Sequence, residues 1–85
     1  MDNKDIVEEI KKITAEQFAV DIDDIFDDTS FFSDLNADSL DAVEIVMMIE
    51  DKFNITISDE DGESFMTVQA VANYVEKKLE DQGGK

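Results

Sequence analysis

The 85-residue chain contains no cysteine, no histidine and no proline. Without cysteine or histidine it has no thiol nucleophile, no disulfide, no Ser-His-Asp triad and no ordinary zinc site. Its three glycines and the missing prolines leave few positions that forbid a helix. No apolar run has the length of a signal peptide or of a membrane span. We therefore expect a cytoplasmic protein with no membrane insertion.

Positive charge is also scarce, because 7 Lys+Arg stand against 23 Asp+Glu, for a formal net charge of −16. Residues 21–66 hold fifteen of the acids and one lysine, Lys52, so this stretch alone carries 1 − 15 = −14. Such a field disfavours nucleic acid and anionic lipid and favours basic partners. Since the flanking segments are nearly neutral, we interpret the middle of the chain as a docking surface rather than as a device for solubility alone.

The hydrophobic pattern predicts an all-α fold, a small bundle of three main helices plus one short helix. Helices are expected over about 3–17, 39–53, 58–63 and 67–80, with a long loop over 18–38 and a frayed tail over 81–85. Asp38 or Ser39 is expected to cap the second helix, Ser58 the third and Thr67 the last. We expect the whole chain, 1–85, to form one domain, with the apolar residues of the loop packed onto its core.

The helix over 39–53 has two apolar faces. At about 100° per residue, Ala42, Ile45, Val46, Ile49 and Phe53 form one stripe, which fits an ordinary core face. Leu40, Val43 and Met47 form a second stripe, between Glu50 on one side and Glu44 and Asp51 on the other. This second stripe either packs under the long loop or forms an exposed binding patch with an acidic rim. We favour the binding patch.

Ser39 begins this helix. A serine there is most often a helix cap, and as a nucleophile it would lack a histidine or a neighbouring lysine as its base. A phosphate ester would suit the position, because a helix N-terminus offers free N–H groups and a positive dipole end. The run Asp34-Leu35-Asn36-Ala37-Asp38-Ser39-Leu40-Asp41-Ala42-Val43-Glu44 resembles the modification site of acyl carrier proteins, and the resemblance extends from Ser30 to Ala70.

The resemblance is closest to the discrete carriers of bacterial-type fatty acid synthesis. It implies that a phosphopantetheinyl transferase (holo-acyl-carrier-protein synthase) moves 4′-phosphopantetheine from coenzyme A to Ser39. It also implies that the thiol of this arm carries the growing acyl chain as a thioester, so that the protein is not itself an enzyme. Other partners would be acyltransferases and fatty acid synthesis enzymes with basic patches, met by a monomer. A specialised D-alanyl or polyketide carrier, or an unmodified acidic interaction module, are the alternatives.

The resemblance also assigns two groups of residues. The partner-docking residues correspond to Asp38, Leu40, Asp41, Val43, Glu44, Met47, Glu50 and Asp51. Periodicity and the family fold together suggest that the pocket for the acyl chain draws on Ile10, Phe31, Ile45, Val46, Ile49, Ile57, Phe65, Val68 and Ala72.

Three residues depart from the family pattern. Asn36 stands where glycine is usual, and Asn tolerates the positive φ that such a turn needs. Ser58 replaces a common proline, and Phe65 replaces a smaller aliphatic residue and is expected to narrow the acyl pocket.

The acidic run over 21–28 lacks the glycine and the ligand spacing of an EF-hand. We therefore expect no specific metal site, and at most weak binding of divalent cations.

Overall fold

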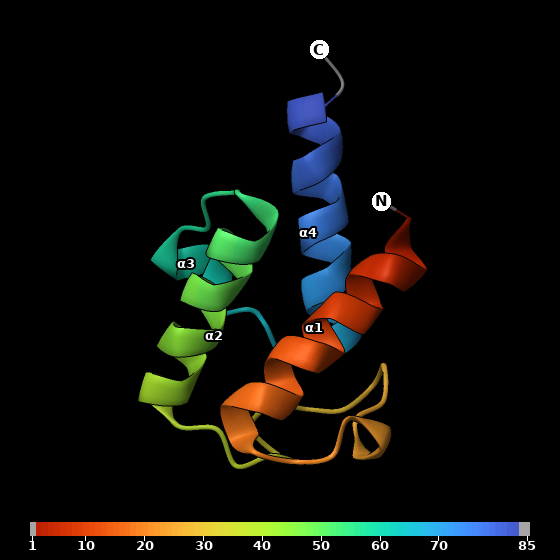
Figure 1. The fold of residues 1–85 in the computed structure, drawn as a ribbon. Coiled ribbons are helices and arrows are strands. Elements are labelled where there is room, and N and C mark those ends of the chain that lie inside the picture. The colour runs from red at the N-terminus through yellow and green to blue at the C-terminus, as the bar shows by residue number, and fades with distance from the viewer. Residues whose placement is uncertain (1, 84–85) are drawn as a thin grey trace.

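The computed structural model describes residues 2–83 and consists of helices joined by loops (Figure 1). In chain order these are α1 (Asn3–Phe18), a 3-10 turn η1 (Ile22–Asp24), α2 (Ser39–Phe53), α3 (Asp59–Gly62) and α4 (Val68–Gly83). Within residues 2–83 the only β-type pairing is an isolated bridge between Ser30 and Thr67. The predicted all-α class is therefore confirmed.

The ends of the helices follow from local capping. Asp2 accepts a hydrogen bond from the backbone N–H of Asp5 at the start of α1. Thr67 Oγ1 accepts one from the N–H of Ala70 at the start of α4. At the other ends, Ala19 and Asn54 adopt left-handed conformations with φ of 55° and terminate α1 and α2.

The C-terminal helix departs from expectation. It starts at Val68 and continues to Gly83, so residues 81–83, which we expected to be frayed, are helical. Its last turns consist of residues with adequate helix propensity and contain no stop signal before the glycines. Residues 84 and 85 of the expected frayed tail lie outside the described part of the chain.

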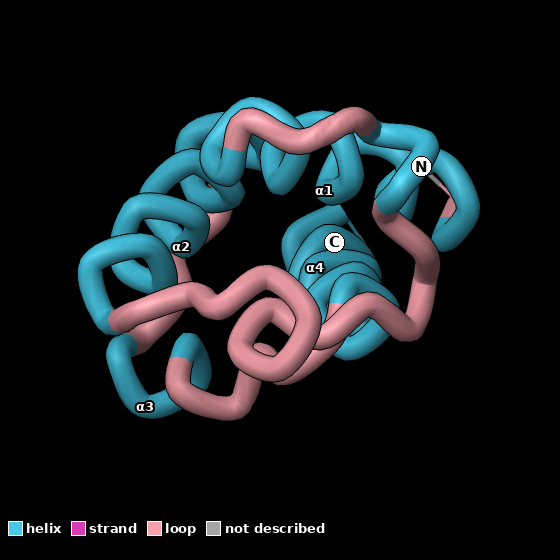
Figure 2. The backbone as a smooth tube through the Cα atoms, turned by 90° about the horizontal axis from the view of Figure 1, so that it is seen from below, coloured by secondary structure: helices cyan, strands magenta, loops and turns pink. Residues whose placement is uncertain are grey.

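The core forms where α1, α2 and α4 meet. In the view from below, α4 is seen nearly along its axis, and α1, α2, α3 and the loops lie around it (Figure 2). Ile6 and Ile10 of α1, Ile49 of α2, and Val71 and Val75 of α4 are all completely buried. The spacing of four residues between Ile6 and Ile10, and between Val71 and Val75, belongs to the apolar periodicity that predicted these helices.

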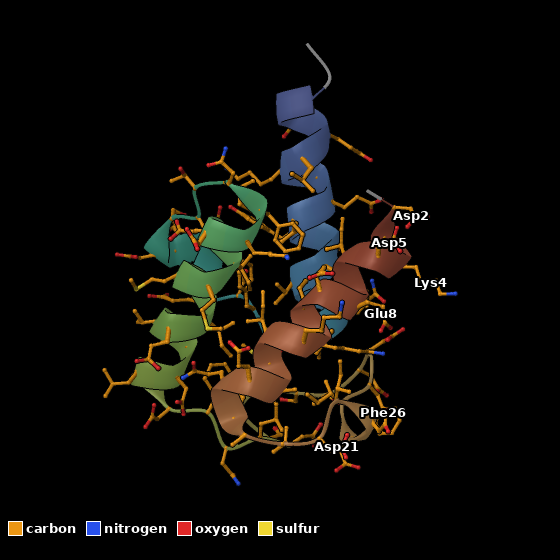
Figure 3. The ribbon with its side chains drawn as sticks, in the orientation of Figure 1. Asp2, Lys4, Asp5, Glu8, Asp21 and Phe26 are labelled. Atoms are coloured by element: carbon orange, nitrogen blue, oxygen red, sulfur yellow. The ribbon has the colours of Figure 1, made fainter. Side chains whose placement is uncertain are left out.

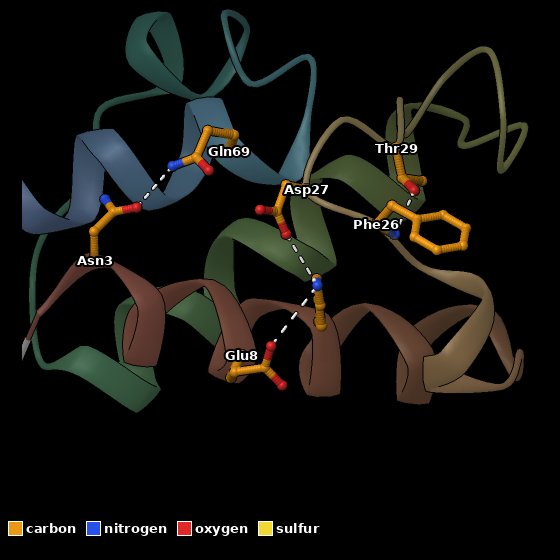
Figure 4. Close-up of polar contacts among 7 residues, drawn as sticks. Asn3, Glu8, Phe26, Asp27, Thr29 and Gln69 are labelled. Carbon is orange, nitrogen blue, oxygen red and sulfur yellow. Dashed lines mark hydrogen bonds and ion pairs between the residues drawn. The ribbon is translucent and has the colours of Figure 1, made fainter.

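The long loop between α1 and α2 is fastened to the start of α4. The backbone N–H groups of Val68 and Gln69 donate to the carbonyl oxygens of Thr29 and Asp27, at 3.2 and 2.8 Å. These bonds satisfy N–H groups that a helix start leaves without a partner. Lys11 of α1 reaches the carboxylate of Asp27 at 2.9 Å (Figure 4), and this hydrogen bond raises the pKa of Lys11.

The loop buries only part of its apolar residues. Ile25 and Phe31 are buried as expected, whereas Phe26 and Phe32 are 61% and 42% exposed. Phe26 projects from the edge of the molecule that lies away from α2 (Figure 3). The expectation that the apolar residues of this loop all pack onto the core is therefore wrong for these two aromatic side chains.

Candidate functional site

Ser39 is the first residue of α2, and its neighbours provide the helix cap. Asp38 Oδ1 accepts the N–H of Asp41 at 2.9 Å, and Asp41 Oδ2 accepts the N–H of Asp38 at 3.2 Å, forming a capping box. Of the two candidates for the cap, Asp38 fills the role, and the alternative that Ser39 is the cap is wrong. The Ser39 side chain is exposed and has no hydrogen-bond partner within residues 2–83.

The backbone around Ser39 is suited to an anion. The first N–H groups of an α-helix have no acceptor within the helix, and the Asp38 side chain takes up only that of Asp41. The N–H groups of Ser39 and Leu40 are thus left for solvent or for an anion, at the positive end of the α2 dipole. A phosphodiester on the Ser39 hydroxyl would therefore fit this helix start.

The turn that leads into α2 is fixed by Asn36. Its φ is 55°, which confirms that asparagine here takes the left-handed conformation usual for glycine. The N–H of Ala37 then donates to the carbonyl of Phe31 at 2.9 Å, and Phe31 is buried. The core thereby holds the residues just before Ser39 while Ser39 itself points into solvent.

The second apolar stripe of α2 is exposed. Leu40, Val43 and Met47 are 74%, 55% and 60% exposed, so the alternative that they pack under the loop is wrong. Asp38, Glu44 and Asp51 beside them are also exposed, and Asp41 is half-buried. We call this strip, formed by Asp38, Leu40, Asp41, Val43, Glu44, Met47 and Asp51, the outer face of α2.

The carboxylates of the outer face are not paired with any cation of residues 2–83. Lys52, the one cation of α2, instead pairs at 3.3 Å with Glu9 of α1, and this contact lowers the pKa of Glu9. The side-chain amide of Gln17 donates to Asp41 and Glu44, a contact that the sequence did not suggest.

Glu50 differs from the other acids that we assigned to docking. It is half-buried, and its Oε2 accepts the backbone N–H of Ile57 at 2.7 Å. This bond ties α2 to the segment that leads into α3. One carboxylate oxygen of Glu50 is therefore engaged inside the molecule rather than available to a partner.

A groove of about 810 Å³ lies between α2 and α3 and reaches Ser39. Val43, Val46 and Met47 line it from α2, Gly62 lines it from α3, and Phe32 lines it from the long loop. The structure thus places an apolar groove next to the serine that we expected to carry a long flexible arm.

The nine residues that we assigned to the acyl pocket divide into two groups. Val46 and Ile57 line the groove. The other seven are buried in the core and do not line it: Ile10, Phe31, Ile45, Ile49, Phe65, Val68 and Ala72. Phe65 packs edge-on against Tyr74, with ring centroids 5.1 Å apart.

Six residues of the groove were not among our candidates: Phe32, Ala42, Ser58, Asp59, Gly62 and Glu63. Phe32 was assigned to the core as an apolar residue, and no periodic signal separates it from the buried Phe31. Gly62 lies within the short helix expected over 58–63, and the sequence analysis gave it no role in a site. A Cβ at Gly62 would lie 3.3 Å from Val46 Cγ2, so the missing side chain lets α3 approach α2 closely. The sequence offered one signal for this role, because Gly62 is the only glycine of the chain apart from Gly83 and Gly84.

Two further properties of residues 2–83 are relevant to function. No helix within residues 2–83 is long and apolar enough to cross a membrane. In the same residues, no three or more acidic side chains are grouped so that they could hold a metal ion.

Comparison with known proteins identifies the family. Residues 8–75 match the protein family described as a phosphopantetheine attachment site. The acyl carrier protein of Thermosynechococcus vestitus is 42% identical over 79 residues, which cover 93% of this chain and 98% of that protein. The chain belongs to the acyl carrier protein family. The acyl carrier protein of Bdellovibrio bacteriovorus is 52% identical over 69 residues, covering 81% of this chain and 88% of that protein.

The fold agrees with this assignment. A solved structure of an acyl carrier protein from Enterococcus faecalis superimposes with a TM-score of 0.76 at 35% identity, covering 92% of this chain and 99% of that one. As a member of the family, the carrier is not an enzyme, and 4′-phosphopantetheine is its cofactor. It functions in fatty acid synthesis, and none of the comparisons favours a specialised carrier or an unmodified interaction module.

Proposed function

We propose that this carrier holds growing fatty acyl chains as thioesters on a 4′-phosphopantetheine arm joined to the Ser39 hydroxyl. The observation that carries the proposal is the state of this hydroxyl. It is exposed at the start of α2, and the capping role that usually occupies such a serine is filled by Asp38. A serine that the fold does not need is free to be modified without loss of structure.

The protein itself contributes the attachment site and the phosphate contacts. The arm supplies the thiol on which the acyl chain is carried. Ser39 supplies the oxygen that is esterified, and the N–H groups of Ser39 and Leu40 accommodate the phosphate. The sequence contains no histidine to activate Ser39, and the carboxylates of Asp38 and Asp41 accept each other's backbone N–H groups. We therefore assign the base for the modification to the phosphopantetheinyl transferase.

The outer face of α2 is the surface that we propose for docking. Its exposed apolar residues, Leu40, Val43 and Met47, would fill a partner's apolar depression. Its four carboxylates would meet a basic rim, together with the second carboxylate oxygen of the neighbouring Glu50, which Ile57 does not engage. Transferases, acyltransferases and fatty acid synthesis enzymes with basic patches are the proposed partners, each meeting a carrier monomer in the cytoplasm.

We further propose that the acyl chain enters through the groove between α2 and α3. Val46 and Ile57 line the entrance, and the seven buried pocket residues would surround the chain once it lies inside. Because these seven now pack against one another, the interior must expand to receive a chain.

The test is intact mass after incubation of unmodified protein with coenzyme A, Mg²⁺ and a broad-specificity phosphopantetheinyl transferase. We expect a gain of one phosphopantetheinyl group in the wild type and in Ser58→Ala, which removes another exposed serine at a helix start. Ser39→Ala should gain nothing while keeping its helical circular dichroism. A gain in Ser39→Ala, or no gain in the wild type, would contradict the proposal.

A further inference from the structure

α3 is the least supported α-helix among residues 2–83. It has only four residues, Asp59–Gly62, and none of them is buried. It nevertheless forms one wall of the groove, opposite α2, with Gly62 facing Val46. A helix with so little buried surface is expected to open locally at low free-energy cost unless something else holds it in place.

One side-chain bond joins α3 to the body of the carrier. Tyr74 Oη of α4 donates to Asp61 Oδ2 at 2.7 Å. Among residues 2–83 this is the only side-chain hydrogen bond or ion pair between α3 and another helix. The other side-chain hydrogen bonds of α3 are local, to Ser58 and Ser64.

Tyr74 is held in position for this bond. Its ring packs edge-on against the buried Phe65, at an interplanar angle of 66°, and Lys78 Nζ lies 5.8 Å from the ring centroid. The phenol of a tyrosine is protonated at neutral pH, and burial together with the bond to Asp61 raises the pKa of Tyr74 further, to about 12. The bond is therefore made by a fixed, neutral donor to a carboxylate, which is among the stronger kinds of hydrogen bond.

We infer that the hydrogen bond between Tyr74 and Asp61 is a latch that holds α3 against α4 and sets how far the groove can widen for a long acyl chain. This role of the latch rests on the proposed function, in which the acyl chain enters the groove from the arm on Ser39. Outward movement of α3 opens the groove and also separates Asp61 from Tyr74. Each additional methylene group of the acyl chain that enters the groove therefore strains the hydrogen bond between Tyr74 and Asp61. Tyr74 is thus a positioning residue that limits the length of acyl chain the carrier can enclose.

The latch itself is tested on the unmodified protein by amide hydrogen exchange. The reporters are the N–H groups of Gly62 and Glu63, which donate to the carbonyls of Ser58 and Asp59. In Tyr74→Phe, which keeps the ring and loses only the hydroxyl, we expect these amides to exchange about five- to tenfold faster relative to those of α4. The matched control is Ser64→Ala, which also deletes one hydroxyl but breaks only a local bond to the Asp61 carbonyl.

Variants of Asp61 provide the second part of this test. Asp61→Ala should reproduce the faster exchange of Tyr74→Phe, and the double variant should add little, because both changes remove one bond. Asp61→Asn keeps an acceptor oxygen and should restore much of the protection. Unchanged exchange in Tyr74→Phe, or an equal effect of Ser64→Ala, would overturn the latch.

The consequence for cargo is tested on carriers loaded with saturated acyl chains of increasing length. Acylation should raise the melting temperature, and the gain should level off at a shorter chain in the wild type than in Tyr74→Phe. If the gain in melting temperature levels off at the same acyl-chain length in both proteins, Tyr74 does not limit the length of the enclosed acyl chain. Failure of the wild type to be loaded at Ser39 would instead overturn the proposed function, and the cargo role with it, while the exchange experiment would still decide whether the latch exists.

Discussion

Neutralising two acids on the outer face of α2 should slow the binding of partner enzymes. The variant is Glu44→Gln with Asp51→Asn. Asp51 is exposed and makes no hydrogen bond or ion pair within residues 2–83, and glutamine at position 44 keeps an acceptor for Gln17. The fold should therefore be unharmed, and loss of two charges from a chain of net charge −16 should relieve repulsion.

The expected magnitude follows from the spacing of the two residues. They lie seven positions apart on one side of α2, which is two turns or about 10 Å along the axis. This exceeds the Debye length of about 8 Å at physiological salt, so each charge should act independently. With about 0.5 kcal/mol for each exposed ion pair, the double variant should bind a phosphopantetheinyl transferase about fivefold more weakly, mainly through slower association.

The assay is stopped-flow association at several salt concentrations. The matched control is Asp24→Asn with Asp28→Asn, two exposed acids of the loop after α1, where the neighbouring Asp21 and Phe26 project away from α2 (Figure 3). Both variants change the net charge from −16 to −14, but only the α2 variant should show a flatter dependence on salt. Equal slowing by the two variants would mean that net charge, and not the outer face, guides the encounter.

Two further predictions concern conformation and pH. Asn36→Val should lower the free energy of unfolding by at least about 1 kcal/mol in urea, because a β-branched residue resists a φ of 55°, whereas Asn36→Gly should change it little; equal stability of the two variants would refute this account of the turn. Phenolate absorbance of the folded protein should titrate near pH 12, since burial and the bond to Asp61 raise the pKa of Tyr74 to about 12 from its usual value near 10. The stability that this bond contributes should be fully present below about pH 10 and lost as the pH rises toward 12. Titration near pH 10 would show that the phenol is not held as described.

The parts of the site that lie on one helix could be predicted from sequence. Residues of α2 repeat at about 100° per residue, so the division between Ile45 and Ile49 inside and Val43 and Met47 outside follows from spacing alone, and the burial of the first pair and the exposure of the second agree with it. Asn36 and Asn54 could be interpreted in the same local way. Both adopt the left-handed conformation, one before α2 and one after it.

The parts that depend on how segments approach one another could not be predicted. Periodicity shows that Glu50 lies beside the second apolar stripe, but not that the N–H of Ile57 would engage its carboxylate. It shows that loop residues are apolar, but not that Phe31 is buried while Phe32 stands in the groove. Such outcomes depend on contacts between residues far apart in the chain, for which one sequence contains no periodic signal.

The same limit explains why the predicted acyl pocket and the observed groove overlap only at Val46 and Ile57. Apolar spacing selects residues that face the interior, and the seven others do face it, but they fill that interior with one another. Under the proposed function, space for an acyl chain would therefore arise only in a rearranged state in which a wall of the groove moves. α3 is the wall that the described structure holds most weakly, since it buries no side chain and has one side-chain bond to another helix. Cargo length in this carrier should thus depend less on the volume of the pocket residues than on the free energy of displacing α3.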